Sequence, residues 1–228
     1  MKRLLVPLLF GLIGTSILIG LGIWQIQRMA VKEAVLAQID ARIAGAPVAL
    51  PVVADPTRDR YLPVSVAGVF DATELHVLVG AKDLGAGYRV IAPFVTEDRR
   101  RILVDRGFIH LEDKENPRTV QAAVVEGNLH WPDEVDGYTP APDNARSIWF
   151  ARDVPAMAAA LNTEQILIIA RRETPDTAEI TPLPVDSSNI PNDHLQYVIT
   201  WFSLAAIWVI MTGFFLWRSR RTTKGEAL

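Results

Sequence analysis

The chain of 228 residues contains no cysteine. This absence excludes a disulfide framework, a zinc site built on thiolates and a copper relay that uses cysteine. Histidine is also scarce, with four residues in the whole sequence. His76, His110 and His130 lack the short spacing of a metal site, so we expect surface or strand-end positions for all three.

Common catalytic and nucleotide-binding motifs are absent from the sequence as well. It contains no G-x-S-x-G, no P-loop and no Rossmann glycine pattern. Residues 28–194 carry 17 basic and 25 acidic residues without a basic aromatic patch, which argues against a nucleic acid as a partner. An enzymatic function for this segment has no motif to support it, and we expect a protein that is not an enzyme.

Formal charge is missing from two long runs, Leu4–Gln27 and Leu195–Trp217. About 20 apolar residues are enough for a helix to cross a bilayer. The first run has no small-residue cleavage pattern, so it is not expected to be a removable signal peptide. The sequence therefore predicts transmembrane helices at residues 4–27 and 195–217, a central domain at 28–194 and a tail at 218–228.

The charges that flank the two runs predict their orientation. The chain ends carry six basic residues against one acidic residue, a net of +5, whereas residues 28–194 have a net of −8. Positive flanks remain on the cytoplasmic side of a membrane. Both termini are therefore expected in the cytoplasm and the central domain outside it. The flanking charges are Lys2, Arg3, Arg218, Arg220, Arg221, Lys224 and Glu226.

One face of the first run combines small and polar residues. Gly11, Thr15, Gly22 and Gln25 fall on this face at about 100° per residue. Small residues allow helices to approach closely in lipid. We therefore expect the two spans to pack on each other through this face.

The second run carries a narrow stripe of polar and aromatic residues. His194, Tyr197, Trp201, Trp208 and Thr212 fall on this stripe at helical spacing. A helix that faces only lipid has no use for such a stripe, so its target is a partner helix or a flat aromatic ligand.

His194 has two interpretations. It is either a solvated residue at the membrane interface or a ligand, because imidazole binds metals and ligates haem iron. For the second case we expect Asn192 or Asp193 to accept the other ring N–H, as supporting groups around metal ligands often do.

The central domain reads as a small α+β unit with a mainly antiparallel sheet, and a helix at residues 29–44 precedes it. Asp105-Arg106-Gly107 is read as an internal ion pair beside a bulge, and Pro63 and Pro93 indicate edges or bulges. Residues 174–191 are expected to be an extended return. The expected strands are Tyr61–Phe70, Leu75–Val79, Tyr88–Val95, Arg101–His110, Val120–Leu129 and Gln165–Arg171, with a short helix at Pro155–Leu161.

Four motifs in this order make the chain resemble the Surfeit-locus family of cytochrome c oxidase assembly factors. The family usually has Asn, Trp and either Asn or Glu where this chain has Asp105, Phe108 and Asp193. The motifs are Gly22-Ile-Trp24-Gln25-Ile-Gln-Arg28, Gly87-Tyr-Arg-Val-Ile-Ala-Pro-Phe94, Ile102-Leu-Val-Asp-Arg106-Gly107-Phe-Ile109 and Pro191-Asn192-Asp-His194-Leu-Gln-Tyr197-Val-Ile-Thr-Trp201-Phe202.

The resemblance implies a function in the biogenesis of haem–copper cytochrome c oxidase, with the catalytic subunit and other assembly factors as partners. It also implies handling of haem a, which places a haem-binding role on His194, beside Tyr197 and Trp201. Arg28 either pairs with a haem propionate or anchors its helix at the interface. The implied location is the bacterial inner membrane, with the central domain in the periplasm. The motif residues Trp24, Gln25, Arg106, Gly107 and Asn192 are carried over without a defined role.

The resemblance leaves two functions open. The protein is either a haem chaperone in the membrane or a scaffold that binds an oxidase subunit and never touches the cofactor. The stripe of aromatic residues suits both. Haem content distinguishes them, because a chaperone copurifies with haem and a scaffold does not.

Overall fold

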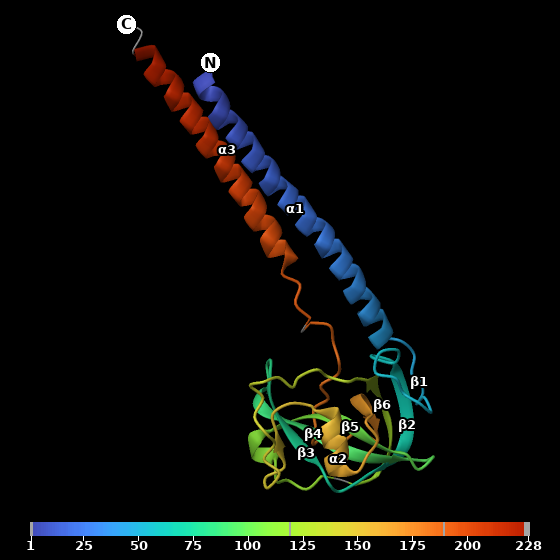
Figure 1. Cartoon of the computed structure of the whole chain (residues 1–228). Helices are drawn as coiled ribbons and strands as arrows, with labels where there is room; N and C mark the ends of the chain where they lie inside the picture. The colour runs from blue at the N-terminus through green and yellow to red at the C-terminus, as the bar shows by residue number, and fades with distance from the viewer. Residues whose placement is uncertain (1, 119, 189, 226–228) are drawn as a thin grey trace. The chain divides into compact units, whose positions relative to one another are not determined.

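The computed structural model describes the backbone of residues 2–118, 120–188 and 190–225, and the side chains of residues 5–118, 120–188 and 190–219. The chain divides into two compact units. The first contains residues 1–38 and 188–228, and the second contains residues 39–187. Figure 1 traces the long helices of the first unit and the sheet of the second.

The first unit is a pair of helices, which we call the helix pair. Helix α1 spans Lys2–Ile43 and helix α3 spans His194–Gly225. Within them, Leu5–Ile43 and His194–Ser219 are long and apolar enough to cross a membrane. Helix α1 continues past the apolar run to Ile43, which confirms the helix expected over residues 29–44. The tail predicted at 218–228 begins inside α3, and the side chains of Lys2, Arg3, Arg220, Arg221, Lys224 and Glu226 lie outside the described residues.

The second unit, which we call the β domain, is built on one mixed sheet that is mostly antiparallel. The order is β1-β2-β6-β8-β5-β4-β3-β7, and β2 pairs again with β4, so β2, β6, β8, β5 and β4 close into a circuit. Only the β1–β2, β3–β7 and β5–β8 pairs run parallel in the described part of the chain. The strands are Val48–Ala49 (β1), Pro63–Phe70 (β2), Leu75–Ala81 (β3), Gly85–Thr96 (β4), Arg101–His110 (β5), Ala122–Leu129 (β6), Ile148–Trp149 (β7) and Leu167–Thr174 (β8).

Two hydrophobic cores lie on opposite faces of the central strands. Successive side chains of a strand point to opposite faces. Accordingly, Ile102 and Val104 of β5 join one core, whereas Leu103 joins the other. Helix α2, Val154–Leu161, covers the second core with Val154, Met157, Ala158 and Leu161. Burial on both faces explains why β5 is apolar over Ile102–Val104 and again at Phe108 and Ile109, on either side of Asp105-Arg106-Gly107.

Helix α2 has clear signals at both ends. The side chain of Asp153 accepts a hydrogen bond from the Ala156 amide at 3.1 Å, and Pro155 occupies the first turn. Asn162 ends the helix in a left-handed conformation. These signals account for the agreement between the helix predicted at Pro155–Leu161 and the observed one.

All six expected strands are present, while β1 and β7 were not predicted. Each of these two has only two residues, too few for an alternating pattern. A 3₁₀ turn at Leu111–Asp113 also follows β5.

The two prolines occupy the positions that lack a ladder hydrogen bond. Pro63 is the first residue of β2. Pro93 lies where the far edge of β4 changes partner, because β3 pairs as far as Ile91 and β2 pairs from Phe94. Pro93 is therefore inside a paired strand rather than at a sheet edge, and it is tolerated because no ladder partner meets it on that side.

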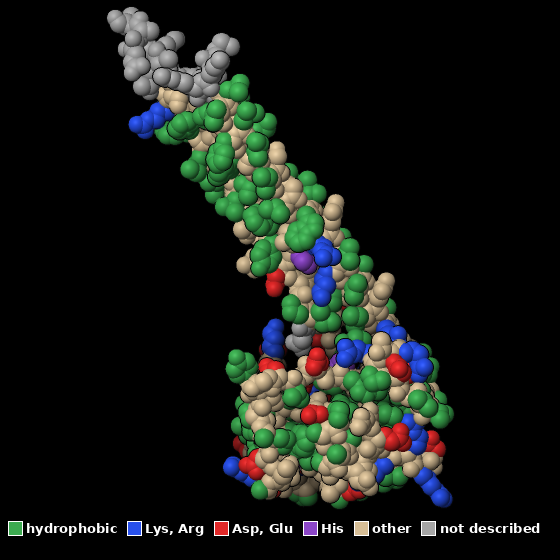
Figure 2. Space-filling model, in the orientation of Figure 1, with side chains coloured by type: hydrophobic (Ala, Val, Ile, Leu, Met, Phe, Trp, Pro, Cys, Tyr) green, Lys and Arg blue, Asp and Glu red, His purple; other side chains and the backbone are tan. Residues whose placement is uncertain are grey.

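The surfaces of the two units differ in composition. Figure 2 shows mostly hydrophobic side chains over the helix pair, whereas charged side chains of both signs gather on the β domain. Leu12, Ile13 and Ile17 of α1 are each more than half exposed. Such a surface fits helices that are surrounded by lipid.

Candidate functional site

The two helices of the helix pair run antiparallel and touch through small residues. A Cβ added at Gly11 would lie 2.3 Å from the Thr212 side chain, and one added at Gly14 would lie 2.4 Å from Trp208. Phe10 and Trp208 also meet, with ring centroids 5.4 Å apart. As the residue number increases along α1, the number of the contacting residue in α3 decreases, so the helices are antiparallel. The packing expected through the small-residue face is confirmed.

The stripe of α3 faces this contact for part of its length. Trp208 and Thr212 lie against α1, so a partner helix is the target for this part of the stripe. Phe202, which helical spacing places off the stripe, also contacts α1, where it lies 2.9 Å from the Cβ position of Gly22. The contact face is therefore broader than the stripe, as helix packing through ridges and grooves requires.

His194 and Gln25 form a hydrogen bond between the two helices. His194 is the first residue of α3, and its Nδ1 lies 2.8 Å from Oε1 of Gln25 in α1. An amide oxygen only accepts hydrogen bonds, so Nδ1 carries the proton and donates it. In the neutral form of the ring Nε2 then holds the lone pair, and within the described residues it makes no hydrogen bond. The lone pair of a neutral imidazole is the group through which histidine binds metals.

The partner of His194 differs from the expected one. We expected Asn192 or Asp193 to accept the second ring N–H, but Gln25 of the facing helix does so. Asn192 and Asp193 precede the first residue of α3, whereas Gln25 reaches the ring from α1. Asn192 Oδ1 is buried without a hydrogen-bond donor among the described residues.

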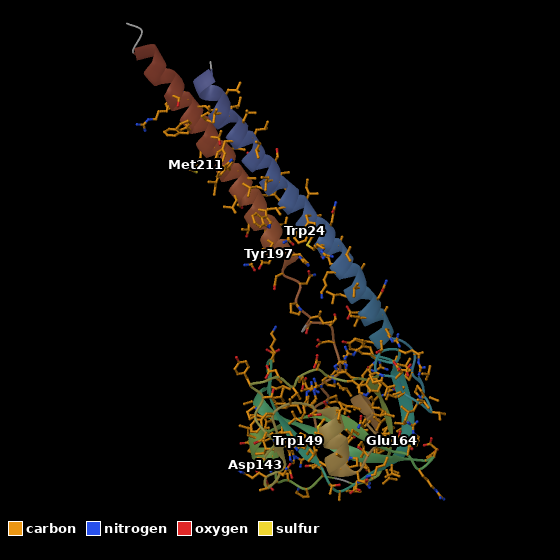
Figure 3. The ribbon with its side chains drawn as sticks, viewed as in Figure 1. Trp24, Asp143, Trp149, Glu164, Tyr197 and Met211 are labelled. Carbon is orange, nitrogen blue, oxygen red and sulfur yellow. The ribbon has the colours of Figure 1, made fainter. Side chains whose placement is uncertain are left out.

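Two aromatic residues of α3 lie deeper than His194 along the same stripe. Tyr197 is 51% exposed, and Figure 3 shows it on α3 at the level of Trp24 on α1. Trp201 is half-buried, and its indole N–H has no acceptor among the described residues. Helical spacing places these two aromatic side chains on the same stripe of α3 as the imidazole.

Arg28 and Trp24 form a second contact on α1. The guanidinium carbon of Arg28 lies 5.8 Å from the centroid of the Trp24 ring, within the range of a cation–π interaction. Both side chains are exposed. The Arg28 side chain lies one turn from Gln25, and it is held over an aromatic ring while its N–H donors remain accessible.

Arg106 is part of the β-domain core instead. It is the extra residue of a β-bulge, because Val90 pairs with Gly107 and Ile91 pairs with Asp105. Its guanidinium lies 2.7 Å from Glu173 and 4.0 Å from the centroid of the Phe70 ring. The predicted bulge is confirmed, but the predicted ion pair within Asp105-Arg106-Gly107 is wrong, because Arg106 pairs with Glu173 and Asp105 pairs with Arg89 and Arg152. Arg106 therefore stabilises the fold.

The neighbours of Arg106 also have structural roles. Asp105 is fully buried and pairs with Arg89 at 2.8 Å and with Arg152 at 3.3 Å. Gly107 has a φ of +128°, and a Cβ there would lie 2.2 Å from the carbonyl oxygen of Thr181. Only glycine tolerates both conditions.

The three histidines of the β domain all lie at or next to strand ends, as expected. His110 is exposed at the end of β5, but His76 is buried and bonds Glu74 at 2.8 Å, so a surface position for His76 is wrong. His130 is partly buried against Tyr61, with ring centroids 5.2 Å apart. Burial lowers the pKa of His130 to about 4, and the nearby charges of Arg152 and Arg60 act in the same direction.

Sequence reasoning singled out both His194 and Gln25 but did not identify the bond that joins them. Gln25 was assigned to the small-residue face of α1, and His194 to the stripe of α3. Placing these two faces opposite each other with antiparallel helices brings both residues to the same level. The signal was therefore present in the two predicted faces taken together.

The fold and this site define a class of membrane protein. Its two apolar helices lie before and after a β domain in the sequence, and a histidine–glutamine hydrogen bond joins them. Residues 12–206 match the SURF1 family. The chain belongs to the SURF1 family.

Relatives of this chain come from animals, a choanoflagellate and a bacterium. It is 33% identical over 216 residues to Surfeit locus protein 1 of Rattus norvegicus, covering 82% of this chain and 68% of that protein. It is 36% identical over 220 residues to a SURF1-like protein of Monosiga brevicollis, covering 86% and 82%. A SURF1-like protein of Rickettsia felis is 29% identical over 211 residues, covering 88% and 92%.

Proposed function

We propose that this protein is a membrane-embedded assembly factor for haem–copper cytochrome c oxidase that binds haem a through Nε2 of His194. Membership of the SURF1 family supports the role in oxidase assembly. The single observation that supports haem binding is the 2.8 Å contact between His194 Nδ1 and Gln25 Oε1, which leaves the lone pair on Nε2. The partners in this proposal are the catalytic subunit and other assembly factors.

The residues around His194 fit a haem group in their chemistry. A haem needs a neutral nitrogen ligand, an apolar wall and cations for its propionates. His194 supplies the nitrogen, Tyr197 and Trp201 supply aromatic surface, and the exposed guanidinium of Arg28 supplies a cation that binds carboxylates. Haem a is cargo in this proposal, so a single protein ligand suits a carrier that must release it.

The proposal places both termini in the cytoplasm and the β domain in the periplasm of a bacterial inner membrane. The net charge of +5 at the chain ends and of −8 in residues 28–194 supports this orientation. In this arrangement His194 and Arg28 are near the periplasmic face. A reporter that is active only in the periplasm, fused after Leu228, is expected to be silent, and an active reporter would contradict the orientation.

The haem proposal is tested by the visible spectrum of the full-length protein purified from cells that make haem a. Wild-type protein should carry haem, and His194→Ala should lower the haem content about tenfold or more, because the iron loses its nitrogen ligand. Trp201→Ala should lower it less. His110→Ala is the matched control, because it removes an exposed histidine of the β domain and should leave the haem content unchanged.

The scaffold function is the alternative outcome of the same experiment. It is favoured by one observation, namely that Trp208 and Thr212 of the stripe already contact α1 rather than a ligand. Full haem content and an unchanged spectrum in His194→Ala would reject the ligand assignment. A protein that never copurifies with haem a would favour the scaffold.

A further inference from the structure

Gln25 is the buried polar side chain among the described residues of the helix pair. It is 8% exposed and lies in a run of α1 that has no formal charge. A buried amide without a partner costs about 1–3 kcal/mol. The Gln25 oxygen avoids this cost by accepting the hydrogen bond from His194 at 2.8 Å.

The contact is held in place by the packing of the two helices. Gly22 lies three residues before Gln25, on the same face of α1, and a Cβ there would lie 2.9 Å from the Phe202 ring of α3. The close approach at Gly22 fixes the distance between the helices next to the hydrogen bond. The orientation of the His194 ring therefore depends on a residue of the other helix.

We propose that Gln25 is a positioning residue that holds His194 in the tautomer with the proton on Nδ1, so that Nε2 is presented as the ligand. The inference rests on the proposed haem function and extends it to a residue that does not touch the iron. Histidines that bind metals usually donate their second ring N–H, and the acceptor fixes both the tautomer and the ring orientation.

The choice of an amide also sets the strength of the ligand. A carboxylate at this position would pull the Nδ1 proton more strongly and make Nε2 a more basic ligand. A neutral amide fixes the tautomer with a smaller increase in basicity. This combination suits a carrier, because the ring is oriented for binding while the bond to iron remains moderate.

The first test uses the protein without haem. Full-length protein with ¹⁵N-labelled histidine is made in cells that do not synthesise haem, and the His194 signals are identified by their loss in His194→Ala. We expect His194 to carry its proton on Nδ1 in the wild type and to populate the Nε2-protonated tautomer in Gln25→Leu. A wild-type ring protonated on Nε2, with the amide N–H donating to Nδ1, would overturn the proposal. An unchanged tautomer in Gln25→Leu would also overturn it.

The second test uses haem-loaded protein and the conservative variant Gln25→Glu. Gln25→Leu should lower haem content about tenfold, and Gln25→Glu should restore it because the acceptor is present again. The iron–histidine stretching frequency in the resonance Raman spectrum should rise in Gln25→Glu relative to the wild type. Gln25 would be only a structural contact if Gln25→Glu left this frequency unchanged.

A control for helix packing keeps these results interpretable. A cysteine pair at Gly11 and Thr212 should still crosslink in Gln25→Leu, which shows that the helix pair is assembled. Wild-type protein that has the expected tautomer but takes up no haem would reject the proposed haem function and leave the role of Gln25 in the tautomer standing. The two ideas therefore fail in different ways.

Discussion

The β domain and the helix pair bury polar groups in opposite ways. In the β domain the buried charged groups are paired with groups of opposite charge, as in Arg106 with Glu173 and Asp105 with Arg89. In the helix pair the buried group is the amide of Gln25, and its partner is the imidazole of His194. In these examples a buried charge of the β domain has a charged partner, whereas the buried amide of the helix pair has an imidazole as its hydrogen-bond partner.

This difference indicates where ligand chemistry is available. Neither side chain of a buried ion pair is available to a ligand, because each charge needs its partner to offset the cost of desolvation. The hydrogen bond of His194 uses one ring nitrogen and leaves the lone pair of the other. This difference supports the proposal that binding belongs to the helix pair, whereas the charged groups of the β domain support the fold.

The two units also achieve close packing by different means. The β domain fills two cores with large aliphatic and aromatic side chains. The helix pair uses glycines, so that Thr212, Trp208 and Phe202 lie against the α1 backbone. Without a hydrophobic driving force between helices in lipid, such close contact is the main source of association.

The largest expected effect comes from breaking a buried ion pair. Arg106→Met leaves the carboxylate of Glu173 buried without its partner, because the Glu173 side chain is only 7% exposed. The cost is about 3–5 kcal/mol. Thermal unfolding of the β domain in the full-length protein can be monitored by limited proteolysis. The midpoint of the unfolding transition should fall by about 10 °C.

Arg172→Met is the matched control for this prediction. Arg172 also pairs with a glutamate across strands β6 and β8, but its side chain is 65% exposed. Exposed ion pairs contribute about 0–1 kcal/mol, so the midpoint should change little. Equal effects of the two substitutions would show that burial does not distinguish the two pairs.

Much of the fold could be predicted because the responsible signals are local. The uncharged runs gave both long helices, and the alternating or continuous apolar runs gave six strands. Helix α2 was predicted at Pro155–Leu161, and Asp153, Pro155 and Asn162 supply the local signals that determine its two ends. Two opposite charges inside a mostly apolar strand suggested a buried ion pair at Asp105 and Arg106, but each of these residues pairs with a distant partner instead.

The remainder depends on contacts between distant segments. The closed circuit of strands requires the second pairing of β2 with β4, and no local pattern specifies it. His76 is buried beside Glu74, and its amide donates a hydrogen bond to the carbonyl of Ser147, which is distant in the sequence. The spacing of the histidines could not predict this burial. The bond between His194 and Gln25 joins residues 169 positions apart, and only the antiparallel packing of two helices brings them together.

A smaller effect is expected from filling the close contact of the helix pair. In Gly14→Leu the new side chain would overlap Trp208, at a cost of about 1–3 kcal/mol. Crosslinking of a cysteine pair at Gly11 and Thr212, for which the chain offers a background without cysteine, should be lost or strongly reduced.

Two controls define this result. Gly20→Leu should crosslink like the unmodified pair, because nothing lies within 4 Å of a Cβ at Gly20. A cysteine at Ile13, which is 57% exposed, should not crosslink to one at Thr212. Crosslinking from Ile13 rather than from Gly11 would reject the contact face.

The smallest effect concerns His130, a neutral ring among the charges of the β domain. Its pKa is about 4 in the folded protein, because burial and the charges of Arg152 and Arg60 disfavour protonation, against a reference value of 6.5. Between pH 6.5 and 4 the unfolded chain binds a proton that the folded chain excludes. The stability that His130 contributes is therefore complete above pH 6.5 and is lost as the pH falls towards 4.

Replacing His130 by glutamine isolates this contribution from that of the carboxylates, which also titrate in acid. The partial exposure of the ring reduces the effect to about 1 kcal/mol. The unfolding midpoint of the β domain in full-length wild type and in His130→Gln should be measured at pH 7, 6, 5 and about 4.5. Wild type should lose more stability than the variant over this range, because glutamine binds no proton in either state. If the unfolding midpoints of the two proteins changed equally with pH, the His130 ring would have the same pKa in the folded and the unfolded chain. His130 would then not be held neutral by the folded β domain.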